Sequence, residues 1–183
     1  MAKRRTKAEL AAFFGKTVPD VIGPGLRAVF CGINPSLSSA ADKVHFATPG
    51  NRFWPSLHKG GLTPRLLHPS ENEALLGYGL GVTNLVARAT ASAAELSDEE
   101  YPEGVQILRE KCETFRPKAV AIVGMGAYRV GFDDRKATLG PQEVRLGTTR
   151  VYVLPNPSGL NAHYSPAKLG ALFGAFREWL EAL

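Results

Sequence analysis

Four short, mainly apolar segments, separated by stretches of helical pattern, constrain the fold of this chain more than any other feature. They lie at residues 26–33, 81–85, 119–123 and 151–154. Apolar runs of this length are typical of strands that are covered on both faces of a sheet. Helical patterns occur at 51–59, 70–76, 103–115, 126–130 and 166–183. Because strand alternates with helix, the sequence predicts an α/β fold with a mostly parallel sheet and helices on both of its faces.

The N-terminal residues are predicted to lie outside this domain. Residues 1–7 carry four cations, and residues 8–14 have the pattern of a short helix. We interpret residues 1–23 as a basic, mobile arm with that helix, and residues 24–183 as a single domain. A cluster of cations at a terminus is compatible with a partner-binding arm and equally with a solvated end that binds nothing.

Composition limits the class of protein further. Hydrophobic residues make up 44% of the chain and charged residues 21%, which is the balance of a folded protein with a core. The net charge of +5 permits a polyanionic partner without requiring one. Two distant cysteines, Cys31 and Cys112, do not suffice for a four-cysteine metal site, so we expect no metal or other cofactor. Without an apolar run of about 18 residues or a signal-type segment, we expect a cytoplasmic protein with no membrane partner. We also expect a monomer.

Polar loops follow three of the four predicted strands, where parallel α/β folds place their working residues. The first loop presents Asn34, whose side-chain amide offers one acceptor and two donors but cannot take up a proton at neutral pH. Any catalysis through Asn34 would therefore act by positioning and electrostatics. The alternative interpretation is an asparagine that only satisfies the backbone of its own turn.

A loop rich in aromatic residues and a loop with one leucine offer two further candidates. Phe46 is the better candidate for stacking on a planar ring, whereas Phe53 and Trp54 are expected to be structural. For His45 we expect a solvated or backbone-bonded imidazole. Leu160 is either tucked into the domain or offered outward as a wedge for a base stack. From the residues alone the tucked position is the favoured one.

Four motifs together resemble the mismatch-specific uracil-DNA glycosylases, the branch of the uracil-DNA glycosylase superfamily that includes thymine-DNA glycosylase. They are Phe30-Cys-Gly-Ile-Asn-Pro35, Gly50-Asn-Arg-Phe-Trp54, Gly81-Val-Thr-Asn-Leu85 and Leu154-Pro-Asn-Pro-Ser-Gly-Leu160. The resemblance implies a three-layer α/β/α domain that flips uracil from G:U mismatched double-stranded DNA and hydrolyses its N-glycosidic bond. It implies no cofactor, and in a bacterium a nucleoid-associated location.

The resemblance also implies roles for individual residues. Asn34 matches the catalytic asparagine that positions the attacking water. The substrate-binding set comprises Gly32, Ile33, Ser39, Phe46 and Asn84. In that set Phe46 matches the stacking aromatic, Asn84 the residue at the pyrimidine edge, and Ser39 a sensor of the 5-substituent. The DNA-binding set comprises Asn156, Ser158, Gly159, Leu160 and Asn161, of which the last three match the loop that enters the duplex.

Two departures from the family pattern leave alternatives open. Ser36 occupies a position where the family usually has glycine, and residues 87–94 contain no acid where related sequences often have one. The segment is either a variable loop or the site of a lost catalytic group. The alternatives are therefore a glycosylase of broader substrate range (single-stranded uracil, G:T, ethenocytosine) and an impaired variant that binds mismatched DNA without excising. A dinucleotide-binding protein is disfavoured because Pro35 replaces the glycine-rich turn.

Overall fold

A computed structural model describes residues 4–183 and has a five-stranded sheet at its centre. The strand order is β2-β1-β3-β5-β4. The strands are β1 (Ala28–Gly32), β2 (Leu80–Asn84), β3 (Ala119–Val123), β4 (Gly140–Leu146) and β5 (Thr149–Leu154). Neighbouring strands run parallel except β4, which pairs antiparallel with β5 at one edge. The predicted mostly parallel sheet is confirmed.

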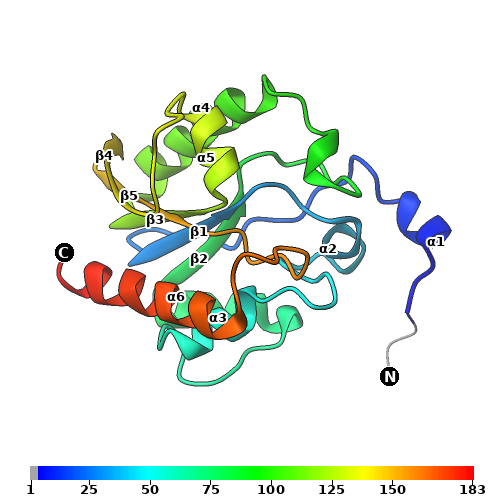
Figure 1. The fold of residues 1–183 in the computed structure, drawn as a ribbon, viewed down its shortest axis with the longest axis horizontal. Coiled ribbons are helices and arrows are strands. Elements are labelled where there is room, and N and C mark those ends of the chain that lie inside the picture. The colour runs from blue at the N-terminus through cyan, green and yellow to red at the C-terminus, as the bar shows by residue number, and fades with distance from the viewer. Residues whose placement is uncertain (1–3) are drawn as a thin grey trace.

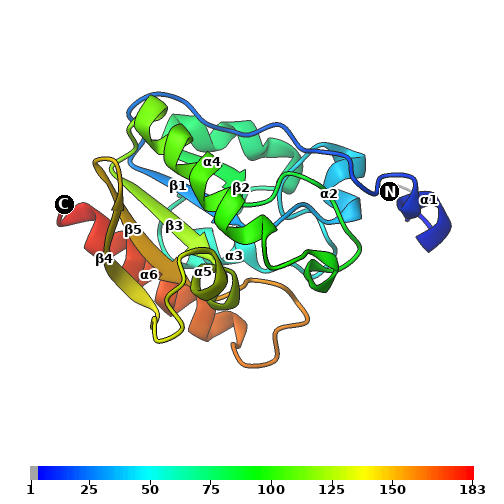
Figure 2. The same ribbon diagram turned by 90° about the horizontal axis from the view of Figure 1, so that it is seen from above.

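Helices cover both faces of the sheet, so the fold has three layers (Figure 1 and Figure 2). On one face, α3 (Phe53–Lys59), the 3₁₀ segment η1 (Pro69–Tyr78) and α6 (Pro166–Glu181) enclose a core that contains Phe30, Phe173 and Phe176. On the other face lie α4 (Glu100–Phe115) and α5 (Met125–Gly131). β1 and β3 are buried along their whole length, which explains their continuous apolar sequence.

Three elements were not predicted from the sequence, and the shortest is the 3₁₀ turn η2 (Ala93–Glu95). β4 alternates exposed and half-buried residues, because as an edge strand it is covered on one side only. Its sequence signal is the alternation of Val144 and Leu146 with Glu143 and Arg145. The short helix α2 (Leu37–Asp42) was also missed; the Ser36 hydroxyl caps it by accepting a hydrogen bond from the Ser39 N–H at 3.0 Å. The cap gives Ser36 a structural role at the position where the family usually has glycine.

The N-terminal segment packs against the domain where the sequence analysis predicted a mobile arm. Its helix α1 (Lys7–Ala11) is followed by residues whose backbone pairs with Ala89 on both sides, Gly15 donating to it and Lys16 accepting from it. Arg5 also pairs with Asp42 of α2 at 2.5 Å. Lys3 lies outside the described residues. In residues 4–183 no helix is long and apolar enough to cross a membrane.

Candidate active site

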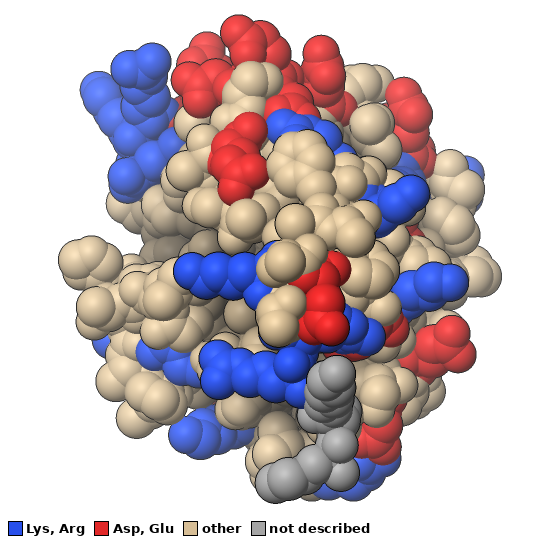
Figure 3. Space-filling view, turned by 90° about the vertical axis from the view of Figure 1, so that its right-hand side faces the viewer, with Lys and Arg blue, Asp and Glu red and all other residues tan. Residues whose placement is uncertain are grey.

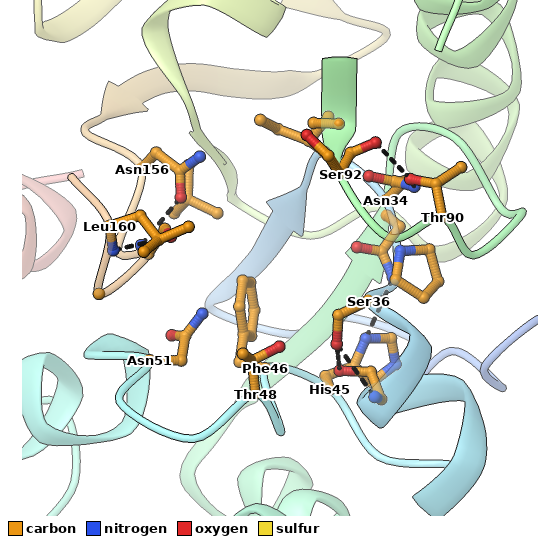
Figure 4. Close-up of a pocket in the computed structure, with 18 of the residues that line it drawn as sticks. Asn34, Ser36, His45, Phe46, Thr48, Asn51, Thr90, Ser92, Asn156 and Leu160 are labelled. Atoms are coloured by element: carbon orange, nitrogen blue, oxygen red, sulfur yellow. Dashed lines mark hydrogen bonds between the residues drawn. The ribbon is translucent and has the colours of Figure 1, made fainter. Parts of the chain in front are cut away.

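A cleft of about 620 Å³ opens at the carboxyl end of the parallel strands. It is enclosed by the loops that follow β1, β2 and β5, together with residues 46–51 and 90–93. In Figure 4, Asn34 and Thr90 lie on one side of the cleft, Asn156 and Leu160 lie on the other, and Phe46 lies between them. Of the predicted site residues, those that line the cleft are Ile33, Asn34, Ser39, Phe46, Asn84, Asn156, Ser158, Gly159 and Leu160.

The side chain of Asn34 is held in one orientation by its neighbours. Its Nδ2 donates to the Arg88 carbonyl at 3.0 Å and to the Thr90 hydroxyl at 2.8 Å. A carbonyl can only accept, so the amide nitrogen must face Arg88. Thr90 in turn donates to the Ser92 carbonyl at 2.7 Å, which leaves its oxygen free to accept. Both amide hydrogens of Asn34 are thus used, and its Oδ1 is the atom available to a ligand in the cleft.

The floor of the cleft is an aromatic pair. Phe46 is half-buried and stacks on Phe53, with ring centroids 4.0 Å apart and an interplanar angle of 22°. Its backbone has φ of 52°, in the left-handed region that non-glycine residues seldom adopt. Phe53 and Trp54 are 0% and 3% exposed, which confirms their predicted structural role.

Gly32, the remaining predicted substrate-binding residue, lies at the edge of this floor. A Cβ atom there would come within 2.6 Å of Asn84 Oδ1 and 3.1 Å of the Phe46 ring. Only glycine lets the floor and Asn84 approach the end of β1 so closely. The carbonyls of Gly32 and Ile33 accept hydrogen bonds from the Leu85 N–H and the Val86 N–H, which tie the end of β1 to the loop after β2.

Ser39 lines the cleft and is held in place by hydrogen bonds to its hydroxyl. Its side chain is buried, and its hydroxyl accepts from the Ala47 N–H at 3.1 Å and from the Ser36 hydroxyl at 3.0 Å. The second contact ties Ser39 to the cap of α2. His45 is also buried, and its Nε2 lies 2.8 Å from the Pro19 carbonyl, which confirms the backbone-bonded interpretation.

The loop after β5 presents Leu160 to solvent on a rigid support. Leu160 is 95% exposed, so the tucked position favoured from the residues alone is wrong. Its N–H donates to the Ser158 hydroxyl, while Asn156 Oδ1 accepts from the Ser158 N–H at 2.9 Å. The side chain of Asn161 lies outside the cleft lining and bonds within the loop, donating to the Asn156 carbonyl at 3.0 Å. A fully exposed leucine on an ordered loop is available to contact a partner.

Arg52 holds this loop in place and was missed as a site residue. Its guanidinium donates to the carbonyls of Tyr164, Ser158 and Asn161, the last two at 2.6 and 2.7 Å. The Arg52 N–H also donates to the Pro157 carbonyl at 2.9 Å. Gly159 lies at the same contact between the two loops. A Cβ atom there would lie 2.6 Å from the Gly50 carbonyl oxygen, which is too close for any residue with a side chain. Arg52 belongs to the motif Gly50–Trp54, but the sequence alone does not distinguish it from a surface cation, because its partners lie in the distant loop after β5.

Part of the segment 87–94, which contains no acid, forms a wall of the cleft. Thr90, Ala91, Ser92 and Ala93 all line it, so this segment is not a loop remote from the site. Among the described residues that line the cleft there is no aspartate or glutamate. Two of the acids that follow along the chain, Glu95 and Glu100, already have hydrogen-bond partners. Glu95 accepts from the Ser92 N–H, and Glu100 pairs with Arg88 at 2.6 Å, which lowers the pKa of Glu100 to about 2.

The face that carries the cleft is unevenly charged. Figure 3 shows this side of the molecule, with Lys and Arg side chains beside a hollowed region, many Asp and Glu side chains towards the top of the view, and others at the centre and lower right. Cations next to a concave site are the arrangement that favours a polyanion such as the nucleic-acid backbone.

Two comparisons with known proteins bear on the family and the fold of this chain. A family model described as the uracil DNA glycosylase superfamily matches residues 19–181. Among solved structures, the chain is similar to a protein from Methanosarcina acetivorans that was proposed to be a uracil DNA glycosylase, determined by solution NMR. The TM-score is 0.60 at 20% sequence identity, over 92% of this chain and 99% of the other, and at that identity the likeness supports the fold. By the family match, which spans nearly all of the described chain, this protein belongs to the uracil DNA glycosylase superfamily.

Proposed function

We propose that this chain is a monofunctional DNA glycosylase that flips uracil out of G:U mismatched duplex DNA and hydrolyses its N-glycosidic bond. The observation that carries the proposal is the placement of Asn34, whose acceptor atom faces a cleft floored by Phe46. The cleft lining in residues 4–183 includes no lysine, which favours water over a lysine amine as the nucleophile. We propose that the chain acts as a monomer, in the cytoplasm.

In the proposed reaction, the flipped uracil stacks on the free face of Phe46 while Leu160 enters the space it leaves. The N1–C1′ bond breaks, and its electron pair leaves with uracil as an anion. Asn34 Oδ1 accepts a hydrogen bond from a water molecule and holds it against C1′ of the oxocarbenium-like sugar. The water oxygen bonds to C1′, and its proton goes to the departing base or to solvent, because an amide cannot take it.

Thr90 fixes Asn34 in this reaction, and its hydroxyl can be removed with little change of shape. We expect Thr90→Val to lower the single-turnover excision rate about tenfold, because Asn34 loses one of the two bonds that orient it. DNA affinity should be unchanged. Thr90→Ser should restore the rate, and Thr48→Val provides the matched control, since Thr48 lines the same cleft without bonding to Asn34. Equal rates for Thr90→Val and wild type would contradict this role.

Leu160 should matter only when a base must leave a duplex. We expect Leu160→Ala to slow excision from G:U duplexes about tenfold and to leave excision from single-stranded uracil within about twofold of wild type. The matched control is Leu66→Ala, since Leu66 is 53% exposed but lies outside the cleft lining. A loss of the same size on both substrates would show that Leu160 does not act as a wedge.

The function is tested by comparing single-turnover excision from G:U, A:U and G:T duplexes and from single-stranded uracil. The proposal predicts that G:U is the best of these substrates. A second candidate function, favoured by the absence of a carboxylate from the described cleft lining, is binding of mismatched DNA without excision. Tight G:U binding with no base release would support that candidate and overturn the proposal.

A further inference from the structure

A buried histidine in the cleft lining contacts the base-binding candidate Asn84 and takes no part in the reaction described above. His45 is 2% exposed and contacts polar groups on two sides. Its Nε2 lies 2.8 Å from the Pro19 carbonyl oxygen, and its Nδ1 lies 3.3 Å from Nδ2 of Asn84. Figure 4 shows the ring at the side of the cleft, below Ser36. When both ring nitrogens of a histidine are hydrogen-bonded, the position of the ring hydrogen determines which partner must accept and which must donate.

The carbonyl of Pro19 determines which nitrogen carries the hydrogen. A carbonyl oxygen only accepts, so Nε2 must be the protonated nitrogen of the ring. Burial lowers the pKa of His45 below its ordinary value, which keeps the ring neutral at pH 7. The neutral ring with hydrogen on Nε2 has a lone pair on Nδ1. Nδ1 is therefore an acceptor, and the group that faces it must be a donor.

Charged groups near the ring neutralise one another. The charges that act on His45 come from Asp20, beside Pro19, and from Lys111 of α4. These two form an ion pair with 2.6 Å between Lys111 Nζ and Asp20 Oδ2, and both also bond to the Thr83 hydroxyl. The backbone around the ring is held separately, since the His45 N–H donates to Asn72 and its carbonyl accepts from Trp54. A change confined to the ring can therefore leave the loop in place.

The tautomer of His45 determines how the side-chain amide of Asn84 is oriented. Nδ2 of Asn84 faces the acceptor Nδ1 of His45, so Oδ1 of Asn84 lies on the opposite side of the amide. That oxygen lies towards Gly32, since a Cβ atom added to Gly32 would be 2.6 Å from it. The side chain then offers the cleft an acceptor and one remaining N–H in a fixed order. Without His45, the two ends of the amide could exchange places, because they have the same shape.

We propose that His45 is a specificity-determining, positioning residue that fixes the amide of Asn84 in the orientation complementary to uracil and opposed to cytosine. This inference rests on the proposed function. Uracil has a donor at N3–H beside an acceptor at O4, which match Oδ1 and N–H of Asn84 in that order. Cytosine has an acceptor at N3 beside an amino donor and would meet like groups at both points. A fixed amide rejects cytosine because the unmatched groups would be buried without partners.

The test is a double-mutant cycle on excision of uracil from a G:U duplex. His45→Gln retains a donor near the Nε2 position for Pro19 but removes the acceptor at Nδ1, and we expect kcat/KM to fall about tenfold. In an Asn84→Ala background the same change should have less than about a twofold effect. His45→Asn, which can place its oxygen at the Nδ1 position, should recover most of the loss. A tenfold loss from His45→Gln in both backgrounds would overturn the proposal.

Product inhibition separates base selection from a general loss of activity. Free uracil should inhibit the wild-type chain more strongly than free cytosine does. In His45→Gln the inhibition constant for uracil should rise about tenfold while that for cytosine stays the same or falls. A parallel rise for both bases would contradict a role in base selection.

A measurement without substrate keeps this inference separate from the proposed function. In the ¹⁵N-labelled chain at pH 7, the His45 ring should give the signals of a neutral imidazole with hydrogen on Nε2. The side-chain amide signals of Asn84 should shift in His45→Gln. A ring with hydrogen on Nδ1, or a charged ring, would overturn the inference whether or not uracil is excised. The expected signals in a chain that excises no uracil would support the His45–Asn84 contact and contradict the proposed function.

Discussion

Asn34→Ala is expected to lower the single-turnover rate of uracil excision by about 10²- to 10⁴-fold, the range associated with losing a positioned catalytic group. The reason is geometric. The Arg88 carbonyl and the Thr90 hydroxyl occupy both amide hydrogens, so Oδ1 is the atom that Asn34 offers to water. The affinity for G:U DNA should change little, because Phe46, Leu160 and the Lys and Arg side chains beside the cleft are left intact. Gel-shift titration and single-turnover excision measure the two quantities separately.

A second asparagine in the same cleft provides the control for this prediction. Asn51 also lines the cleft, but its Oδ1 accepts from the Phe53 N–H at 2.9 Å at the start of α3. Asn51→Ala should therefore lower stability modestly and keep the excision rate within about threefold of wild type. If Asn34→Ala excised uracil as fast as Asn51→Ala does, Asn34 would not be the residue that positions the water.

Arg52→Met should give the second largest loss, about 100-fold in excision from G:U duplexes. The substitution keeps an apolar stem but removes the donors to the carbonyls of Tyr164, Ser158 and Asn161, so the loop that carries Leu160 loses its support. Hydrogen bonds from a charged group contribute about 1.5–3 kcal/mol each. We expect the affinity for G:U duplexes to fall as well, and single-stranded uracil to be affected less.

Arg177→Met separates the loop effect from a general loss of stability. Arg177 of α6 is also half-buried and donates to a backbone carbonyl, that of Gly60, at 3.0 Å, but lies outside the cleft lining. Both variants should show a lower Tm, whereas only Arg52→Met should lose excision. An Arg52→Met chain that is less stable but fully active would show that the loop keeps its working shape without this arginine.

The sheet, and the edge of the sheet that carries the cleft, could be predicted from the sequence because both depend on local patterns. Segments 26–33, 81–85, 119–123 and 151–154 are apolar because helices cover them on both faces, and each became a strand. Parallel strands place their carboxyl ends at one edge, and this brings Asn34, Asn84 and Asn156 to one cleft. β4 escaped prediction because an edge strand covered on one side carries a weaker apolar signal.

The features that could not be predicted depend on contacts between distant residues. Thr90 is 56 positions from Asn34, and Arg52 is more than 100 from the carbonyls it holds, so neither pairing leaves a local pattern. The exposure of Leu160 follows from bonds within its loop and from Arg52, whereas leucine as a residue type favours the interior. The orientation of Asn84 depends on the tautomer of His45, which in turn depends on the Pro19 carbonyl.

The central claim is tested most directly by incubating excess chain with an end-labelled G:U duplex and measuring both free uracil and strand scission. Our account predicts that one uracil is released per duplex, that scission occurs only after alkali, and that a matched G:C duplex stays intact. Binding of the G:U duplex without uracil release would contradict the account, and so would scission that needs no alkali.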